Sequence, residues 1–163
     1  MRRKDKEITD ISAKIDIIDR CKVCRLGLSD KDQPYVIPLN YGYSFSGGKL
    51  TLFFHGAKEG MKVDIIKRNN RACFEMDCDL GLIVGDAPHK YSYAFKSIIG
   101  FGKITILESH KEKTDALNEI MKHQTGKDTR YTYPDEQLDG VLIYKVDADE
   151  FSGKHKEFPK KES

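Results

Sequence analysis

The sequence lacks a strong net charge, a long apolar run and an apolar leader, and each absence argues against a class of function. Among its 163 residues, 28 Lys and Arg face 26 Asp and Glu, which gives a formal net charge of +2. So small an excess, without a basic stripe interleaved with aromatics, argues against a nucleic-acid partner. No apolar run approaches the ~20 residues that cross a bilayer, and the opening MRRKDKEITD has no apolar core of a secretory signal. We therefore expect no membrane partner and a cytoplasmic location.

Cysteine is also sparse, with four residues whose spacing does not favour a metal site. Cys21 and Cys24 form a C-x-x-C pair, whereas Cys73 and Cys78 are five positions apart. Both pairs are predicted to lie in strands, where residues three or five apart point to opposite faces. We therefore expect no metal site, and buried thiols that stay reduced.

The residues that are present fit one folded domain. Apolar residues make up 39% of the chain and charged residues 33%, and a chain of this length can bury a full hydrophobic core. No internal repeat or low-complexity tract divides it. We predict a single domain over residues 1–155 and a solvated basic tail over residues 156–163.

Hydrophobic spacing predicts the order helix, three strands, helix, two strands, helix and strand. Isoleucines three and four apart indicate the first helix, and the paired glycines 47 and 48 indicate a type I′ hairpin turn. Because hairpin-linked strands outnumber crossover helices, we expect a mostly antiparallel sheet in a small β-barrel with helices outside. The predicted helices are 9–19, one around Lys62 that ends near Asn69, and 109–126; the predicted strands are 24–30, 35–43, 50–54, 71–77, 92–107 and 141–146, with loose segments at 79–90 and 129–140.

The stretch FFHGAKEGMKVDII, which begins at Phe53, joins a strand to a helix start that carries two lysines, Lys58 and Lys62. A helix N-terminus has free amide donors and the positive end of the helix dipole. Together with a nearby lysine, it is suited to bind an anion, above all a phosphate. An ordinary strand-to-helix junction with solvated lysines is the alternative.

Two strands contain residues that weaken a β ladder. Pro38 cannot donate to a neighbouring strand, so it belongs at an edge, at a bulge or where the barrel is split open, and it leaves the backbone at Leu39 and Asn40 free for another partner. An ordinary edge strand without a ligand is the alternative. Gly100 and Gly102 lie on one face of their strand, which leaves that face bare for a ligand; a bend at a barrel corner is the alternative. Their spacing is not the G-x-G-x-x-G of a dinucleotide site, and no helix follows.

Four stretches in this order, PYVIPLNYGY, the Gly-Gly hairpin, LTLFFHGAKEGMKVDIIKRNNRACFEMD and FKSIIGFGKI, resemble the pyridoxamine-phosphate-oxidase-related flavoproteins. Within that superfamily the sequence looks most like the branch of the nitroimidazole-resistance proteins. The resemblance covers nearly the whole chain, to about His155. It implies a mainly β fold with flanking helices, a six-stranded antiparallel split β-barrel, and a homodimer that binds FMN in two clefts between the subunits.

The resemblance also assigns residues to the flavin ring and the ribityl chain. Four consecutive residues match the strand whose backbone lies along the isoalloxazine ring, and one serine matches a polar residue near the phosphate and the ribityl chain. The four are Pro38, Leu39, Asn40 and Tyr41, and the serine is Ser97.

A second group matches the segment that leads to the FMN phosphate and the lysine that holds it. This group consists of Phe54, His55, Gly56, Ala57 and Lys62. His55 has two readings, a catalytic one in which it positions ligand or moves a proton, and one in which it only donates a hydrogen bond on the phosphate side.

The implied function is that of an FMN-dependent oxidoreductase, which takes electrons from NADH or NADPH and passes them to a small organic acceptor such as a nitroimidazole or another nitroaromatic. The alternative is a non-catalytic protein that binds or stores FMN or haem. The reaction of pyridoxamine-phosphate oxidase itself is not expected, because the chain end FSGKHKEFPKKES has no Arg-x-His arrangement for a substrate phosphate.

Overall fold

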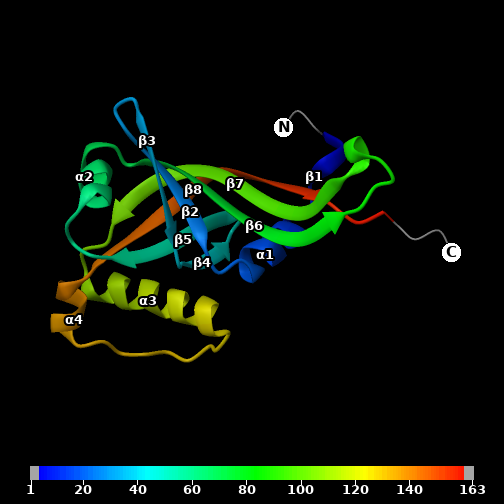
Figure 1. Ribbon diagram of the computed structural model, residues 1–163. Helices are drawn as coiled ribbons and strands as arrows, with labels where there is room; N and C mark the ends of the chain where they lie inside the picture. The colour runs from blue at the N-terminus through cyan, green and yellow to red at the C-terminus, as the bar shows by residue number, and fades with distance from the viewer. Residues whose placement is uncertain (1–3, 160–163) are drawn as a thin grey trace.

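An eight-stranded antiparallel sheet forms the body of the protein in this computed structural model, which describes residues 4–159 (Figure 1). The strands are β1 (Glu7–Ile8), β2 (Cys24–Asp30), β3 (Gln33–Leu39), β4 (Gly42–Ser46), β5 (Lys49–Gly56), β6 (Arg71–Ile83), β7 (Ser92–Ile106) and β8 (Leu142–Lys156). The helices are α1 (Ile11–Arg20), α2 (Met61–Arg68), α3 (His110–Thr125) and α4 (Asp135–Gly140), with 3-10 turns at Lys4–Lys6 and Pro88–Lys90.

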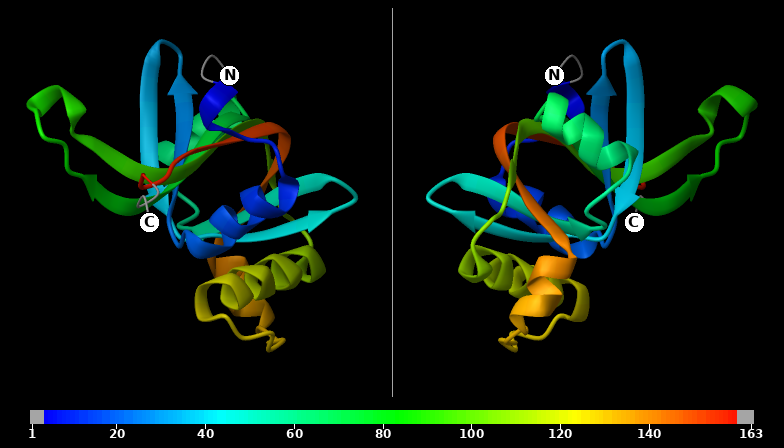
Figure 2. Two further views of the ribbon diagram at one scale, coloured as in Figure 1. Left: turned by 90° about the vertical axis from the view of Figure 1, so that its right-hand side faces the viewer. Right: turned by 90° about the vertical axis from the view of Figure 1, so that its left-hand side faces the viewer.

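The strand order is β3-β2-β6-β7-β8-β5-β4, with β1 added beside β8. Every pairing is antiparallel, so the predicted mainly β split-barrel fold with flanking helices is confirmed, with eight strands in place of six. Figure 2 shows α1 against one side of the curved sheet, and α3 with α4 beside the β4–β5 hairpin. No helix within residues 4–159 could span a bilayer.

Alternating side chains of the strands build the core. In β2 and in the first part of β6, up to Met76, every second residue is buried, and the register sets Leu26 opposite Phe74 so that both fill the interior. The largest buried cluster joins these side chains to Ile17 and Ile18 of α1 and to Ile65 of α2. The amphipathic stripes that the sequence indicates are therefore what holds the helices to the sheet.

Local signals in the sequence place the turns and caps correctly. Gly47 and Gly48 adopt φ angles of 57° and 78° between β4 and β5, as a type I′ hairpin requires. The Ser109 side chain caps α3 by accepting from the Glu112 N–H, and Gly126 ends the helix with φ 70°. For α1, the cap is Asp10, whose side chain accepts from the Ala13 N–H.

The predicted strand 35–43 is in fact two strands, β3 and β4, with a break at Asn40 and Tyr41. The break follows from packing against α3, because a Cβ on Gly42 would collide with the backbone at Ile120. The chain leaves the sheet there and turns the Tyr41 side chain into the core. Strand alternation alone does not reveal this change of direction.

Three other segments are more regular than the sequence predicts. The supposedly loose region 79–90 contains the end of β6, which stays paired with β7 up to Ile83. The loop 129–140 contains α4, and the last strand runs fifteen residues, from Leu142 to Lys156. This strand passes the predicted domain end by one residue, and residues 160–163 of the predicted tail lie outside the described residues.

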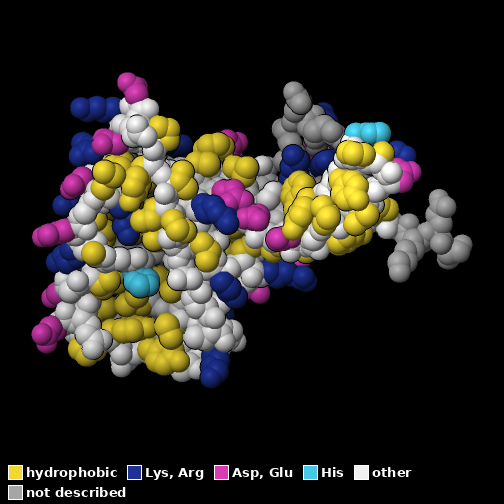
Figure 3. Space-filling model, in the orientation of Figure 1, with side chains coloured by type: hydrophobic (Ala, Val, Ile, Leu, Met, Phe, Trp, Pro, Cys, Tyr) yellow, Lys and Arg dark blue, Asp and Glu magenta, His cyan; other side chains and the backbone are white. Residues whose placement is uncertain are grey.

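The β6–β7 hairpin forms an arm that extends beyond the rest of the sheet, at the end opposite to α2 (Figures 1 and 2). Apolar side chains gather on its surface (Figure 3). Five large ones, Leu80, Leu82, Val84, Tyr91 and Tyr93, are exposed by 40% to 71%.

Helix α4 is attached to α3 by a histidine between two carboxylates. His110 Nδ1 lies 2.9 Å from Asp135 Oδ1, and its Nε2 lies 2.9 Å from Asp139 Oδ1. The hydrogen bond to Asp139, helped by the charge of Asp135, raises the pKa of His110 above its ordinary value. No local pattern in the sequence indicates this contact, because 25 or more positions separate the histidine from its partners.

This contact makes the stability of the protein depend on pH. A histidine whose pKa is raised on folding contributes its full stability below its unfolded pKa of about 6.5, and the contribution is lost as pH rises through the folded value. The free energy of unfolding should therefore fall between about pH 6 and pH 8, and His110→Gln should reduce that fall. Urea unfolding at both pH values, with His89→Gln as the control, measures the difference. Equal pH dependence in wild type and His110→Gln would contradict the expectation.

Candidate functional site

Pro38 lies on an edge strand, the plainer of the two interpretations of that residue. Among the described strands, β3 pairs with β2 alone. Pro38 and Asn40 are exposed and Leu39 is half-buried. The Asn40 side chain is engaged, since its Nδ2 donates to the Lys22 carbonyl at 3.0 Å and to Gln124 Oε1 at 3.3 Å. The edge is thus exposed, and its C-terminal end is attached to α3 through the contact between Asn40 and Gln124.

Tyr41 and Phe54 have side chains that are completely buried. The Tyr41 hydroxyl donates to the Ile18 carbonyl at 2.6 Å, and the Phe54 ring stacks on Tyr144 with centroids 5.4 Å apart. Any contact that either residue makes with a ligand must therefore use its backbone. For Tyr41 this agrees with the backbone role that the family resemblance implies.

The start of α2 contains a half-buried lysine without an acidic partner. Lys62 Nζ lies 5.6 Å from the centroid of the Tyr144 ring, and it forms no hydrogen bond or salt bridge within residues 4–159. Burial lowers its pKa, because desolvation disfavours the ammonium. A Cβ on Gly56 would lie 2.5 Å from Nζ, so the missing side chain of Gly56 provides the space for the ammonium.

The backbone beside this lysine offers further donors. Gly60 precedes α2 with φ 114° and provides no side-chain cap. Its carbonyl accepts from the N–H groups of Val63 and Asp64, so the N–H groups of Met61 and Lys62 lie before the first intrahelical bond and have no partner in the helix. We call this group, Gly56, Gly60, Lys62 and Tyr144, the Lys62 cradle. An unpaired ammonium at a helix N-terminus is suited to bind a phosphate.

The imidazole of His55 lies outside the Lys62 cradle. His55 precedes Gly56 in β5, and successive residues of a strand point to opposite faces. Because the Gly56 position faces Lys62 Nζ, His55 faces away from it, and it is exposed with no hydrogen-bond partner in the described part of the chain. Ala57, the next predicted residue, is exposed in the turn before α2.

Ser97 lies far from the Lys62 cradle within one chain. In β7 it pairs with Lys154 of β8, whereas His55, beside the cradle, pairs with Ile143 of the same strand. The two positions are eleven residues apart along β8, a path on the order of 35 Å at ~3.3 Å per residue. One copy of the chain therefore does not bring Ser97 to the Lys62 cradle.

The interpretation of Gly100 and Gly102 as a bare face for a ligand is wrong. Both glycines are buried. A Cβ on Gly100 would overlap the Phe74 ring, and one on Gly102 would overlap the Asp147 carbonyl. The pairing of β7 with β8 also shifts register between Phe101 and Gly102. The glycines therefore allow β8 and the core to approach β7 closely, as at a barrel corner.

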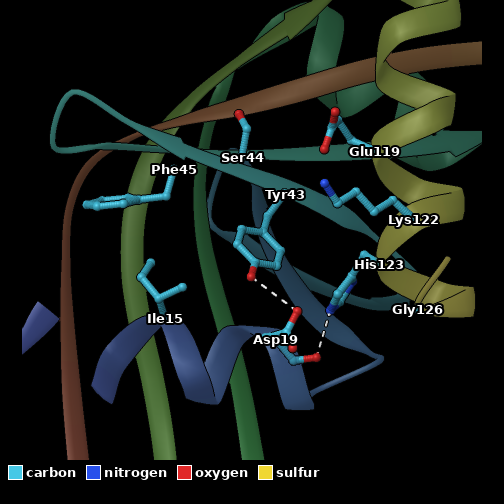
Figure 4. Close-up of a pocket in the computed structure, with 9 residues that line it drawn as sticks. All are labelled: Ile15, Asp19, Tyr43, Ser44, Phe45, Glu119, Lys122, His123 and Gly126. Atoms are coloured by element: carbon cyan, nitrogen blue, oxygen red, sulfur yellow. Dashed lines mark hydrogen bonds between the residues drawn. The ribbon is translucent and has the colours of Figure 1, made fainter. Parts of the chain in front are cut away.

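A separate cavity of about 550 Å³ opens between α1, β4 and α3 (Figure 4). Tyr43 donates to Asp19 Oδ1 at 3.2 Å, and His123 contacts the carbonyls of Asp19 (3.1 Å) and Tyr41 (2.7 Å) through its two ring nitrogens. The charged residues at the rim are paired as well, Lys122 with Asp128 and Glu119 with Arg130. This cavity lacks the unpaired charge that distinguishes the Lys62 cradle.

No motif in the sequence marks His123 as a functional or structural centre. The only available signal was its spacing on α3, three residues after the buried Ile120. Its ring holds α3 to the end of α1 and to the backbone of Tyr41. Among residues 4–159, no three His, Cys, Asp or Glu side chains are arranged to hold a metal ion.

Comparison with known proteins gives a family and several similar folds. A family model described as pyridoxamine 5'-phosphate oxidase matches residues 11–155. A candidate 5-nitroimidazole antibiotic resistance protein from Bacteroides thetaiotaomicron has a similar structure, with a TM-score of 0.79 and 31% identity over 91% of this chain and 86% of that one. A search of curated proteins gave no match.

Two more distant structures share the fold. The flavocytochrome Anf3 from Azotobacter vinelandii has a TM-score of 0.80 at 14% identity, over 100% of this chain and 75% of that one. The FAD and heme binding protein from Mycobacterium smegmatis has a TM-score of 0.78 at 18% identity, over 96% of this chain and 77% of that one.

Proposed function

The chain belongs to the pyridoxamine 5'-phosphate oxidase family, and from this premise we propose that it is a flavoprotein that binds FMN and acts as an oxidoreductase. The observation that carries the proposal is the Lys62 cradle. It combines an ammonium without an acidic partner among residues 4–159, free amides at a helix start and a glycine, Gly56, whose missing side chain makes room for that ammonium. These are the features that a phosphate dianion needs, so the residues present fit the cofactor.

Each part of the cradle would contribute to holding the phosphate. The Lys62 ammonium would form a charge-assisted hydrogen bond, while the free N–H groups of Met61 and Lys62 supply neutral donors and the dipole of α2 adds to the attraction. Since burial lowers the pKa of Lys62, a bound anion would favour the charged form and raise that pKa again.

The flavin ring would lie against the backbone of the β3 edge, from Pro38 to Tyr41. Asn40 is held by Lys22 and Gln124, so this backbone is rigid where a flat ring would contact it. The outward orientation of His55 favours its catalytic reading over the phosphate reading. Exposed, and without a hydrogen-bond partner among the described residues, its imidazole is free to donate to a substrate or to move a proton. When bound, FMN itself would supply the hydride and electron chemistry.

We propose a homodimer with FMN between the subunits. Ser97 and the Lys62 cradle are too far apart in one chain to contact one cofactor, so Ser97 would serve the site of the other subunit. The outer face of the sheet provides an apolar row for contact, because Val36, Gly27, Cys73 and Phe101 are paired across four strands, with Val36 63% and Phe101 46% exposed. Light scattering at micromolar concentration should give twice the chain mass, and a monomer there would overturn this arrangement.

The reaction that we propose is transfer of electrons from NADH or NADPH to a small organic acceptor. The description of the Bacteroides thetaiotaomicron protein suggests a nitroimidazole or another nitroaromatic as that acceptor. The fold is also shared by a protein described as binding FAD and heme and by one described as a flavocytochrome. The visible spectrum distinguishes the two cofactors.

The first experiment is the visible absorption spectrum of the purified protein with added FMN, recorded anaerobically before and after NADPH or NADH. We expect paired flavin bands that bleach with a nicotinamide and recover when a nitroaromatic is added. A flavin spectrum that neither nicotinamide bleaches would overturn the oxidoreductase and leave a flavin carrier. A Soret band, or failure to bind FMN at all, would overturn the flavoprotein.

A further inference from the structure

Two thiols from distant parts of the chain face each other at the end of α1. Cys21, which the sequence places in a strand, instead follows the last residue of α1 and donates its N–H to the Ile17 carbonyl at 3.1 Å. Cys78 lies on β6, 57 positions away, and the two Sγ atoms are 3.3 Å apart. The other thiols in the described part of the chain, Cys24 and Cys73, make no such contact.

We propose that Cys21 and Cys78 are a modification site that forms a reversible intramolecular disulfide. A disulfide bond is about 2.05 Å long, so the sulfur atoms need to approach by only about 1.3 Å. Cys78 is fixed by its pairing with Lys96 in the sheet. Cys21 lies in extended backbone just past the helix end, with φ −74° and ψ 131°, where a small adjustment does not break the helix.

The two sulfur atoms differ in access, and this sets the order of the steps. Cys21 is 6% exposed, and burial together with the neighbouring thiol raises its pKa, so it remains a thiol. Cys78 is half-buried and more accessible to a reagent. Cys78 is therefore the first to react and Cys21 the resolving thiol.

The oxidant that we propose is a low-molecular-weight disulfide. The Cys78 thiolate attacks one sulfur of the reagent, which forms a mixed disulfide and releases the first small thiol. Cys21 then loses its proton to solvent and attacks Cys78 Sγ, which forms the protein disulfide and releases the second small thiol. The protein pair loses two electrons, and the reagent gains them as it becomes two thiols.

The bridge would attach the end of α1 to β6 directly behind a predicted cofactor-binding residue. The Tyr41 hydroxyl lies 3.0 Å from the Cys21 carbonyl and 3.1 Å from Met76 Sδ. Oxidation would therefore stiffen the support of the Asn40 and Tyr41 backbone. Neither thiol lies in the Lys62 cradle, so this inference stands or falls independently of FMN binding.

The test treats reduced protein, freed of reductant, with glutathione disulfide. We expect wild type to lose two of its four thiols in an Ellman assay, and a non-reducing peptide map to join the Cys21 peptide to the Cys78 peptide. A bridge over 57 positions restricts the unfolded chain, so Tm should rise by on the order of 10 °C and fall again with dithiothreitol.

Matched variants separate the bridge from general thiol reactivity. Cys73→Ser, on the same strand and also half-buried, should still lose two thiols and gain the same Tm. Cys21→Ser should stop at the glutathione adduct of Cys78 without the gain in Tm, and Cys78→Ser should lose no thiol at Cys21. A wild-type protein that stays at the glutathione adduct, keeps all four thiols or joins a different pair would overturn the proposal.

Discussion

Replacing Lys62 with methionine is expected to raise the Kd for FMN roughly 10- to 150-fold, which corresponds to about 1.5–3 kcal/mol for a charge-assisted hydrogen bond. Methionine keeps an unbranched apolar stem against Tyr144 and removes only the charge. The ammonium that is lost has no acidic partner in the described structure and lies over the gap at Gly56. Quenching of FMN fluorescence on titration measures the change.

Two further variants make this result specific. Lys67→Met removes an exposed charge from the last turn of the same helix and should leave the Kd unchanged. Gly56→Val keeps Lys62 but fills the space that its ammonium occupies, so it should weaken FMN binding while the protein stays folded. If Lys62→Met bound FMN as tightly as wild type, the cradle would not be the phosphate site.

Gly100→Val is expected to lower the free energy of unfolding by at least about 3 kcal/mol, the upper range for forcing extra atoms into a packed core. Its Cβ would overlap the Phe74 ring, which is fully buried, and would lie 2.8 Å from the Glu150 carbonyl. The ring could move only by displacing other core side chains, and the carbonyl belongs to the paired strand β8. Urea unfolding followed by circular dichroism measures the loss.

Gly140→Ala is the matched control, because no atom lies within 4 Å of the Cβ that it would add. Its stability should stay within about 0.5 kcal/mol of wild type. A Gly100→Val protein that folded with wild-type stability but failed to bind FMN would contradict the packing account and restore the interpretation of this face as a flavin platform.

The glycines differ in how far their roles can be predicted from the sequence. Gly47 and Gly48 were correctly interpreted because a hairpin turn needs positive φ whatever surrounds it. For Gly100 and Gly102 the sequence left two interpretations open, a bare face for a ligand and a barrel corner, because it does not reveal which face of a strand is turned inward. That choice depends on a register shift against β8, more than 40 residues further along the chain.

The residues of the candidate site also fall into those that local sequence patterns predict and those whose placement depends on long-range strand pairing. The helix start and Lys62 follow from local periodicity and sequence order, and the structure adds that the ammonium has no acidic partner in the part of the chain that it describes. The orientation of His55 and the distance of Ser97 depend on strand pairing across the whole sheet. The break before β4 was missed because Tyr35 to Tyr43 alternates equally well in one strand or two; only the close approach of α3 to Gly42 separates them.

The edge strand β3 has a consequence for aggregation. Pro34, Val36 and Pro38 are two positions apart, so their backbone nitrogens point to the same side of β3. A paired edge strand tolerates proline only where the nitrogen faces away from its partner strand, so this side of β3 faces away from β2. Of three successive outward positions, only Val36 retains an N–H. A strand from another molecule would find one donor in place of three, so this exposed edge is a poor template for β-sheet polymerisation.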